Sequence, residues 1–218
     1  MKQTTEGYRR IEPTTLMAPL PVVMVSCRDP ESGRANIVTA AWSGIVNTHP
    51  PMLSLSLKPE RYSYGIIRAS GEMVVNLVDR RHARACDFCG VRSGRDVDKF
   101  QTLGLETVDV EGCSVAPGIA GMPVHLGCSV EEIRPLGSHD LILAQIRSVS
   151  VREDLFDGDG SMHLERAGLI CYSHGLYQQV GDVLGFFGYS VARPEVYRKR
   201  MQPFQGERDR KASSRGRK

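Results

Sequence analysis

Apolar and polar residues along the chain follow a pattern that predicts mainly β-structure. Between Met52 and Lys58 the two kinds alternate, as they do in a strand with one buried face. The other apolar runs are short and end in turn-forming residues, which is also typical of strands. The predicted strands span residues 22–27, 36–42, 52–58, 72–78, 124–134 and 140–151.

Short helices are predicted between some of these strands. They span residues 62–70, 80–89 and 96–103, with Asp79 as the N-cap of the second and Gly104 just after the third. Few regular helical crossovers separate consecutive strands, so a parallel sheet is disfavoured. A mainly β fold with a small, closed or partly closed antiparallel barrel is expected.

The composition fits a globular chain, because 41% of its 218 residues are hydrophobic. No apolar run reaches the length of a membrane span, and the N-terminal region does not have the pattern of a signal peptide. We therefore expect a cytoplasmic protein without a membrane partner. Its six cysteines are expected to be reduced thiols.

Positive charge is concentrated at the C-terminus. Residues 193–218 hold ten of the 28 basic residues but only three of the 25 acidic ones. A tail of this kind can bind nucleic acid, although a solvated, flexible terminus is the favoured interpretation. The chain is therefore divided into an N-terminal extension (1–18), one domain (19–192) and a basic, flexible tail (193–218).

The segment 54–63 predicts an anion site where a strand turns into a helix. A helix N-terminus offers unpaired N–H groups and a partial positive charge, which suit a phosphate. Lys58 and Arg61 add charge, and Ser56 and Ser63 add hydroxyl donors. The segment is not a P-loop, because the chain contains no GxxxxGK[ST] motif.

Two further segments extend this candidate site. Residues 93–100 combine a flexible turn, two cations and an aromatic ring, and they either form a second wall of the site or begin a solvated helix. Residues 36–44 contain small side chains that leave backbone groups accessible to a flat ligand. Trp42 either stacks on that ligand or fills the core.

Other motifs carry little functional signal. The chain has neither a Rossmann GxGxxG fingerprint nor a GxSxG nucleophile elbow. The group His82, Cys86 and Cys89 has too few ligands for structural zinc, and the late position of the cysteine pair in its helix favours packing over redox chemistry. The loop 157–161 does not continue as a calcium site. We expect no metal ion and nominate no catalytic residue.

Taken together, these segments resemble the flavin reductase-like family with an FMN-binding split barrel, most closely its flavoredoxin-like branch. The resemblance runs from about residue 19 to residue 190. The residues that carry it are Asn36, Thr39–Trp42, Gly44, Pro50–Pro51, Ser54–Leu57, Pro59, Arg61–Tyr64, Val75–Leu77, Cys89–Gly90, Ser93–Phe100, Gly137–Asp140 and Gly185–Ser190.

The resemblance implies a six-stranded antiparallel Greek-key split barrel with short flanking helices. It also implies a homodimer that binds FMN near the subunit interface. The residues it assigns to the cofactor are Thr39, Ala40, Ala41, Trp42, Ser56, Lys58, Arg61, Tyr62, Ser63, Ser93, Gly94, Arg95, Lys99 and Phe100. The first four would line the isoalloxazine ring, the next five would hold the phosphate and ribityl chain, and the last five would close over the flavin.

The resemblance also implies a role for His139. It matches a Gly-x-His motif that many flavin reductases place near the nicotinamide side of the flavin, whereas the alternative is a histidine that bonds to its own turn. Ser138 stands where many reductases carry an aspartate, which weakens the inference that the protein uses NADH.

The function favoured by the resemblance is that of an FMN flavoprotein oxidoreductase. It would pass hydride from NAD(P)H to the bound flavin and on to an acceptor, with the cofactor supplying the chemistry. One alternative is a flavoredoxin-type electron carrier that a redox partner protein reduces. The other is a barrel without catalytic activity whose basic tail binds a partner or a nucleic acid.

Overall fold

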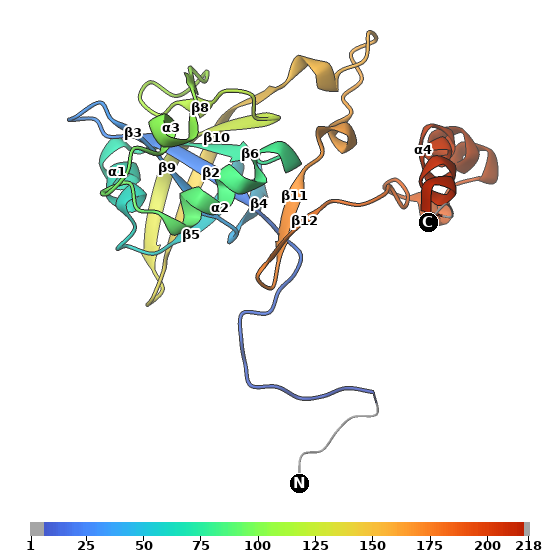
Figure 1. Cartoon of the computed structure of the whole chain (residues 1–218), viewed down its shortest axis with the longest axis horizontal. Helices are drawn as coiled ribbons and strands as arrows, with labels where there is room; N and C mark the ends of the chain where they lie inside the picture. The colour runs from blue at the N-terminus through green and yellow to red at the C-terminus, as the bar shows by residue number, and fades with distance from the viewer. Residues whose placement is uncertain (1–6, 216–218) are drawn as a thin grey trace.

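A computed structural model describes residues 7–215 of the chain, with side chains for residues 7–204 (Figure 1). Its main body is an antiparallel sheet of seven strands in the order β3-β2-β6-β9-β10-β5-β4. These strands are β2 (Val23–Arg28), β3 (Ala35–Ala40), β4 (Ser43–Thr48), β5 (Pro51–Leu57), β6 (Glu72–Leu77), β9 (Val124–Pro135) and β10 (Asp140–Val151). The predicted mainly β class is confirmed, but the main sheet has one strand more than the six expected.

Smaller elements surround this sheet. A second sheet is formed by β1 (Leu20–Pro21), β11 (Ile170–Ser173) and β12 (Leu176–Gln179), while β7 (Thr107–Val108) pairs with β8 (Gly118–Ile119). The α-helices of the described residues are α1 (Tyr62–Ser70), α2 (Ala83–Val91), α3 (Lys99–Leu103) and α4 (Pro194–Arg215). Short 3₁₀ turns span residues 80–82, 153–155, 164–167 and 189–191.

Strand β2 is buried on both faces, which explains why it begins with consecutive apolar residues, Val23–Val25. Val23 and Val25 point into the barrel interior with residues of β5 and β10. Met24, on the opposite face, joins a second apolar cluster together with residues of α2 and α3 such as Cys86 and Phe100. The helices α2 and α3 therefore cover the outer face of β2 and β3.

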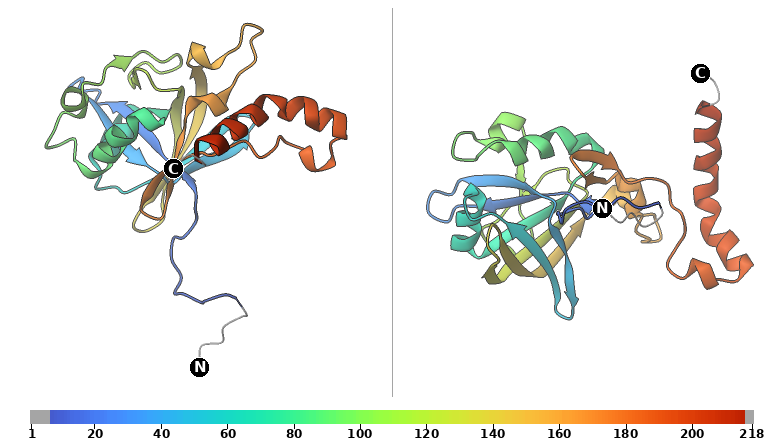
Figure 2. Two further views of the ribbon diagram at one scale, coloured as in Figure 1. Left: turned by 45° about the vertical axis from the view of Figure 1, so that its right-hand side comes forward. Right: turned by 90° about the horizontal axis from the view of Figure 1, so that it is seen from below.

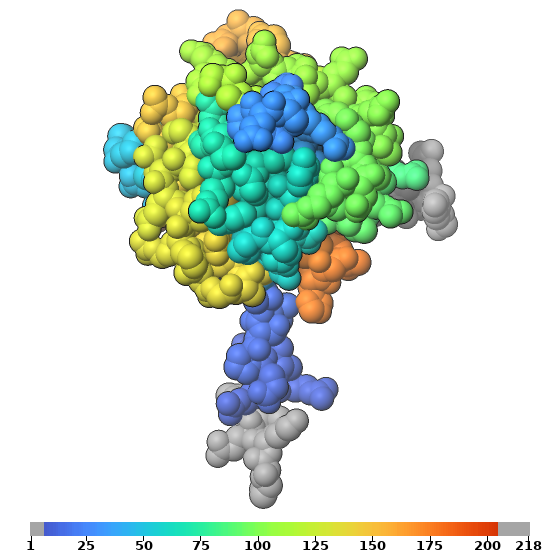
Figure 3. Space-filling model, turned by 90° about the vertical axis from the view of Figure 1, so that its left-hand side faces the viewer, coloured from blue at the N-terminus to red at the C-terminus, as the bar shows by residue number. Residues whose placement is uncertain are grey.

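The curl of the sheet positions the candidate site. It brings the chain that follows β3 against β5, where the Ser56 N–H donates a hydrogen bond of 2.8 Å to the Trp42 carbonyl. The α1 helix follows β5 directly, and the segment that leads to α3 lies beside it on the same face of the molecule (Figure 3). Three segments that are separate in the sequence thus meet at one place.

Several predicted boundaries need correction. The third helix begins at Lys99 rather than residue 96, because the Asp98 carboxylate accepts the Gln101 N–H and caps it there. The predicted helix from residue 80 begins as a 3₁₀ turn, and α2 itself starts at Ala83. Asp79 is confirmed as a cap, since its carboxylate accepts the backbone N–H groups of Arg81 and His82.

The described segments before β1 and after β12 extend away from the barrel (Figure 1). The N-terminal segment before β1 has no helix or strand in its described part, and α4 lies to one side of the body (Figure 2). The segment expected to be a flexible tail is helical from Pro194 to Arg215, which the charge pattern did not predict. The domain boundaries at residues 18 and 192 stay predictions. Among the described helices, none is long and apolar enough to cross a membrane.

Candidate functional site

A cavity of about 260 Å³, hereafter the cationic cavity, lies between the start of α1 and the segment before α3. It is lined by eight residues predicted from the sequence: Lys58, Arg61, Tyr62, Ser63, Ser93, Gly94, Arg95 and Lys99. It also contains five that were not assigned to the site, namely Asn36, Val38, Glu60, Cys89 and Arg92. The fold thus brings together the segments 54–63 and 93–100, which were predicted from the sequence to form two walls of one site.

The first turn of α1 is arranged to receive an anion. Its N-cap is Arg61, which makes no side-chain capping bond, and the turn contains no acidic residue. Ser63 is buried there, and its hydroxyl accepts a hydrogen bond of 2.7 Å from the Asn36 amide. The partial positive charge of the helix N-terminus is therefore not offset by a carboxylate within the turn.

The cations of the cavity contact mainly backbone carbonyls. The Arg61 guanidinium donates to the Gly90 carbonyl over 3.2 Å, and the Arg95 guanidinium donates to the Glu60 carbonyl over 3.1 Å. Lys58 lies 3.5 Å from the carboxylate of Glu60, which is the only acidic side chain among the lining residues. Five cations and one carboxylate leave a clear excess of positive charge.

Lys99 is the buried cation of the cavity. Its ammonium group donates to the carbonyls of Ile37 and Cys89 over 2.6 and 2.7 Å, and the residue is 3% exposed. Burial lowers the pKa of Lys99 from its ordinary value, and the charge of Arg61 acts in the same direction. A bound anion would favour the charged form of this lysine.

Lys99 and Arg61 also cover the C-terminal end of α2. The carbonyls of Cys89 and Gly90 lie in the last turn of that helix, where the partial charge is negative and would repel an anion. Both carbonyls accept hydrogen bonds from these two cations. The cavity therefore presents positive charge from α1 without an exposed negative end of α2.

Gly94 allows the two walls to approach closely. A β-carbon at this position would lie 2.2 Å from the Asn36 amide oxygen and 2.7 Å from a ring carbon of Tyr62. Any side chain would therefore separate the wall that precedes α3 from β3 and α1. The guanidinium of the neighbouring Arg95 lies over the Tyr62 ring, 5.5 Å from its centre.

A second cavity of about 520 Å³, hereafter the uncharged cavity, lies further along β5. Of the residues predicted to bind the cofactor, Trp42 and Ser56 line it. The others in its lining are Thr14, Thr15, Leu16, Met17, Leu20, Ser43, Gly44 and Ser54. Lys58 directly follows the last residue of β5, two positions after Ser56, so the two cavities lie near each other at the end of this strand.

The remaining predicted residues lie in other surroundings. The ring of His139 lies 4.7 Å from that of Trp42, and its Nδ1 atom lies 3.0 Å from the Ser138 hydroxyl. The Thr39 hydroxyl donates to the Cys86 carbonyl of α2. Phe100 packs into the apolar cluster beneath α2, and Ala40 is buried at the end of β3, whereas Ala41 is partly exposed. Their roles toward a cofactor stay predictions.

The cysteines of α2 fit a packing role. Cys86 and Cys89 are buried in the apolar cluster, and burial raises their pKa values to about 12 and about 11. Thiols with such values are protonated at neutral pH and react poorly. Among the described residues, no group of three or more potential ligands is arranged to hold a metal ion.

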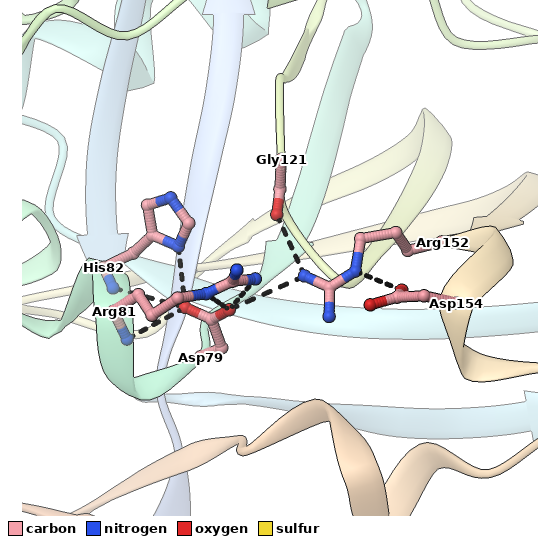
Figure 4. Close-up of polar contacts among 6 residues, drawn as sticks. All are labelled: Asp79, Arg81, His82, Gly121, Arg152 and Asp154. Carbon is pink, nitrogen blue, oxygen red and sulfur yellow. Dashed lines mark hydrogen bonds and ion pairs between the residues drawn. The ribbon is translucent and has the colours of Figure 1, made fainter.

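A second region rich in cations surrounds Asp79, hereafter the Asp79 cluster, with Arg81, His82, Arg152 and Asp154 (Figure 4). The Asp79 carboxylate is 1% exposed, and nitrogen atoms of Arg81 and His82 lie 2.7 Å from it. Arg152 lies 3.7 Å from Asp79 and also pairs with Asp154. The cations of this cluster thus contact carboxylates.

Comparison with known proteins identifies the family. The flavin reductase like domain matches residues 17–181, which is most of the chain. The chain belongs to this family. Its fold is the split barrel, as the sequence resemblance predicted.

Individual relatives agree with this assignment. Flavoredoxin of Desulfovibrio vulgaris (Miyazaki F) superimposes with a TM-score of 0.78 and 26% identity, covering 85% of this chain and all of that one. An uncharacterized protein of Aeropyrum pernix is 30% identical over 147 residues, which are 67% of this chain and 56% of that protein. The FMN reductase (NADH) RutF of Cronobacter sakazakii is 22% identical over 132 residues, covering 61% of this chain and 76% of that protein.

Proposed function

We propose that this protein binds FMN and passes hydride from NAD(P)H to the bound flavin and on to an acceptor. The observation that carries the proposal is the excess of positive charge in the cationic cavity, where Lys99 and Arg61 contact backbone carbonyls and not carboxylates. Such a cavity favours an anion, and a phosphate monoester supplies up to two negative charges and several acceptor oxygens.

The residues present fit the parts of FMN in order along β5. The phosphate would lie in the cationic cavity, held by Arg61, Lys99 and the hydroxyl of Ser63. The ribityl chain would pass Lys58 and Ser56, and the ring would lie against the backbone of residues 39–42. FMN bound there would supply the hydride-transfer chemistry, which the side chains alone cannot perform.

The chain itself supplies binding, orientation and shielding. The cations of the cationic cavity would anchor the tail of the cofactor, and Gly94 lets the two walls approach closely on either side of it. The rings of Trp42 and His139 contact each other in a tilted arrangement at the edge of the site, where they would limit access to one end of the flavin ring. The relatives named FMN reductase (NADH) support hydride transfer from a nicotinamide cofactor.

A second candidate function is that of an FMN electron carrier without nicotinamide turnover, reduced by a redox partner protein. It is favoured by the likeness to flavoredoxin at 26% identity over 85% of the chain. Ser138, which stands where many reductases carry an aspartate, also favours the electron-carrier function.

We also propose that the protein is a homodimer. Strand β4 is at the edge of the main sheet, and its side chains Ile45 and Val46 are 66% and 51% exposed. An exposed edge strand with apolar residues is a surface that a second copy can cover. Light scattering of the wild type should give twice the monomer mass, and Ile45→Lys should shift it toward the monomer. A monomeric wild type would refute this proposal.

The visible spectrum and an anaerobic titration test the function. The purified protein should be yellow, or become so with added FMN, and NADH or NADPH should bleach it. A protein that dithionite bleaches but neither nucleotide does would be an electron carrier. A protein that takes up no FMN would refute both functions.

A further inference from the structure

The uncharged cavity differs from the cationic cavity in the charge of its lining and in its volume. All ten residues that line it are uncharged, and its volume of about 520 Å³ suits a small organic molecule. One of its sides is the sheet, with Trp42, Gly44 and Ser56. The other is the N-terminal segment, with Leu16 and Met17.

The position of the cavity connects it to the proposed flavin site. Ser56 is the second-last residue of β5 and Lys58 directly follows the end of that strand, and each lines one of the two cavities. A flavin whose phosphate lies beside Lys58 and whose ring reaches Trp42 would therefore lie on the sheet side of the uncharged cavity. The N-terminal side would remain for a second molecule in contact with the ring.

The lining selects the chemistry of that molecule. An ionic group would lose its hydration without meeting an opposite charge, so a charged ligand is disfavoured. Trp42 is 40% exposed and offers an aromatic surface, and the serine and threonine hydroxyls can donate to a carbonyl oxygen. A small, flat, uncharged molecule with carbonyl groups fits these conditions.

We propose that the uncharged cavity binds the electron acceptor, and that the acceptor belongs to the class of neutral quinones. This inference rests on the proposed function. The quinone would take up a hydride from the reduced flavin and a proton from water and leave as a hydroquinone, and the flavin would return to its oxidised form. The N-terminal segment thereby becomes part of the acceptor site.

Binding can be measured without turnover, because Trp42 is the only tryptophan of the chain. Its fluorescence reports directly on the cavity. Oxidised, FMN-loaded protein is titrated with naphthoquinone and, separately, with naphthoquinone sulfonate. We expect saturable quenching by the neutral quinone and at least about tenfold weaker binding of the sulfonate.

Two matched variants of the N-terminal segment complete the test. Leu16→Asp places a charge in the lining, while Ile11→Asp places the same charge on an exposed residue of the same segment outside the lining. Leu16→Asp should weaken naphthoquinone binding about tenfold, and Ile11→Asp should leave it unchanged. The FMN affinity of both variants should equal that of the wild type.

Three outcomes would overturn the inference: equal binding of the two quinones, unaltered quinone binding in Leu16→Asp, or a loss of FMN affinity in that variant. The last would place the segment against the flavin itself. Failure of the wild type to bind FMN is read from the separate FMN titration, so it refutes the proposed function and is not confused with the other outcomes.

Discussion

The cationic cavity and the Asp79 cluster both concentrate arginine, yet the arginines have different partners. In the Asp79 cluster, Arg81 and Arg152 contact a carboxylate that is almost fully buried. In the cationic cavity, Arg61 and Arg95 contact backbone carbonyls. A carbonyl orients a guanidinium but leaves its positive charge in place. A carboxylate orients the guanidinium and also neutralises its charge.

This difference separates a structural role from a binding role. The Asp79 cluster joins the turn before α2 to the chain after β10, and its charges compensate one another. The positive charge of the cationic cavity remains available to a ligand. The partners of a cation, and not its residue type, therefore indicate which region binds an anion.

The largest effect is expected from Asp79→Ala. It leaves Arg81 and Arg152 without their buried partner and removes the cap of the 3₁₀ turn, so the free energy of unfolding should fall by about 3–5 kcal/mol. Denaturant titration measures this loss, and FMN affinity of the folded protein should not change. Asp154→Ala, at an exposed partner of Arg152, is the control and should leave stability unchanged. Equal stability of the two variants would refute a structural role for Asp79.

A smaller effect is expected from Arg61→Ala, and it should change FMN affinity and not stability. It removes a charge-assisted contact to the phosphate, so FMN binding should weaken by about 1.5–3 kcal/mol while stability stays nearly constant. Calorimetric titration with FMN measures the change. Arg68→Ala, in the last turn of the same helix, should bind FMN as the wild type does. Unchanged affinity in Arg61→Ala would remove this residue from the site.

The smallest effect is a difference in pH dependence: the stability contributed by the Asp79 cluster and the FMN affinity of the cationic cavity should change in different pH ranges. Although burial alone would raise it, hydrogen bonds from Arg81 and His82 hold the pKa of Asp79 below its ordinary value of about 4. The stability that Asp79 contributes is therefore present above that value and is lost as pH falls through its lowered pKa. FMN affinity should instead begin to fall near pH 6, where a phosphate monoester gains its second proton.

Denaturant titrations of wild type and Asp79→Asn over a pH series measure how the stability contributed by Asp79 depends on pH. Their difference in unfolding free energy should shrink only in the acid range. A difference that shrinks already near neutral pH would contradict the assignment of this stability to the Asp79 carboxylate.

The sequence predicted elements whose signal is local. The alternation from Met52 to Lys58 reports a strand with one buried face, and α1 was predicted with its observed bounds. Strand β4 escaped prediction because five of its six residues are exposed, so it shows no alternation. Its strand structure is imposed by pairing with β5 and not by its own pattern.

The residues of the candidate site also fall into two groups: those that a local sequence signal indicated and those that only the fold brings together. Lys58, Arg61 and Lys99 were found because charge and turn residues cluster near them in the sequence. Asn36 was quoted for the resemblance but not assigned to the site, since its contact with Ser63 exists only once β3 and α1 meet. The link between Asp79 and Arg152 likewise arises from the fold, because these residues are far apart in the sequence.

A comparison of FMN with riboflavin tests the function of the cationic cavity most directly, because the two ligands differ only in the phosphate. Protein freed of flavin is titrated with each ligand in a calorimeter. If the cations of this cavity hold the phosphate through at least two charge-assisted hydrogen bonds, FMN should bind at least about 100-fold more tightly than riboflavin. Equal affinities would show that the cavity does not bind the phosphate, and its unneutralised charge would need another ligand.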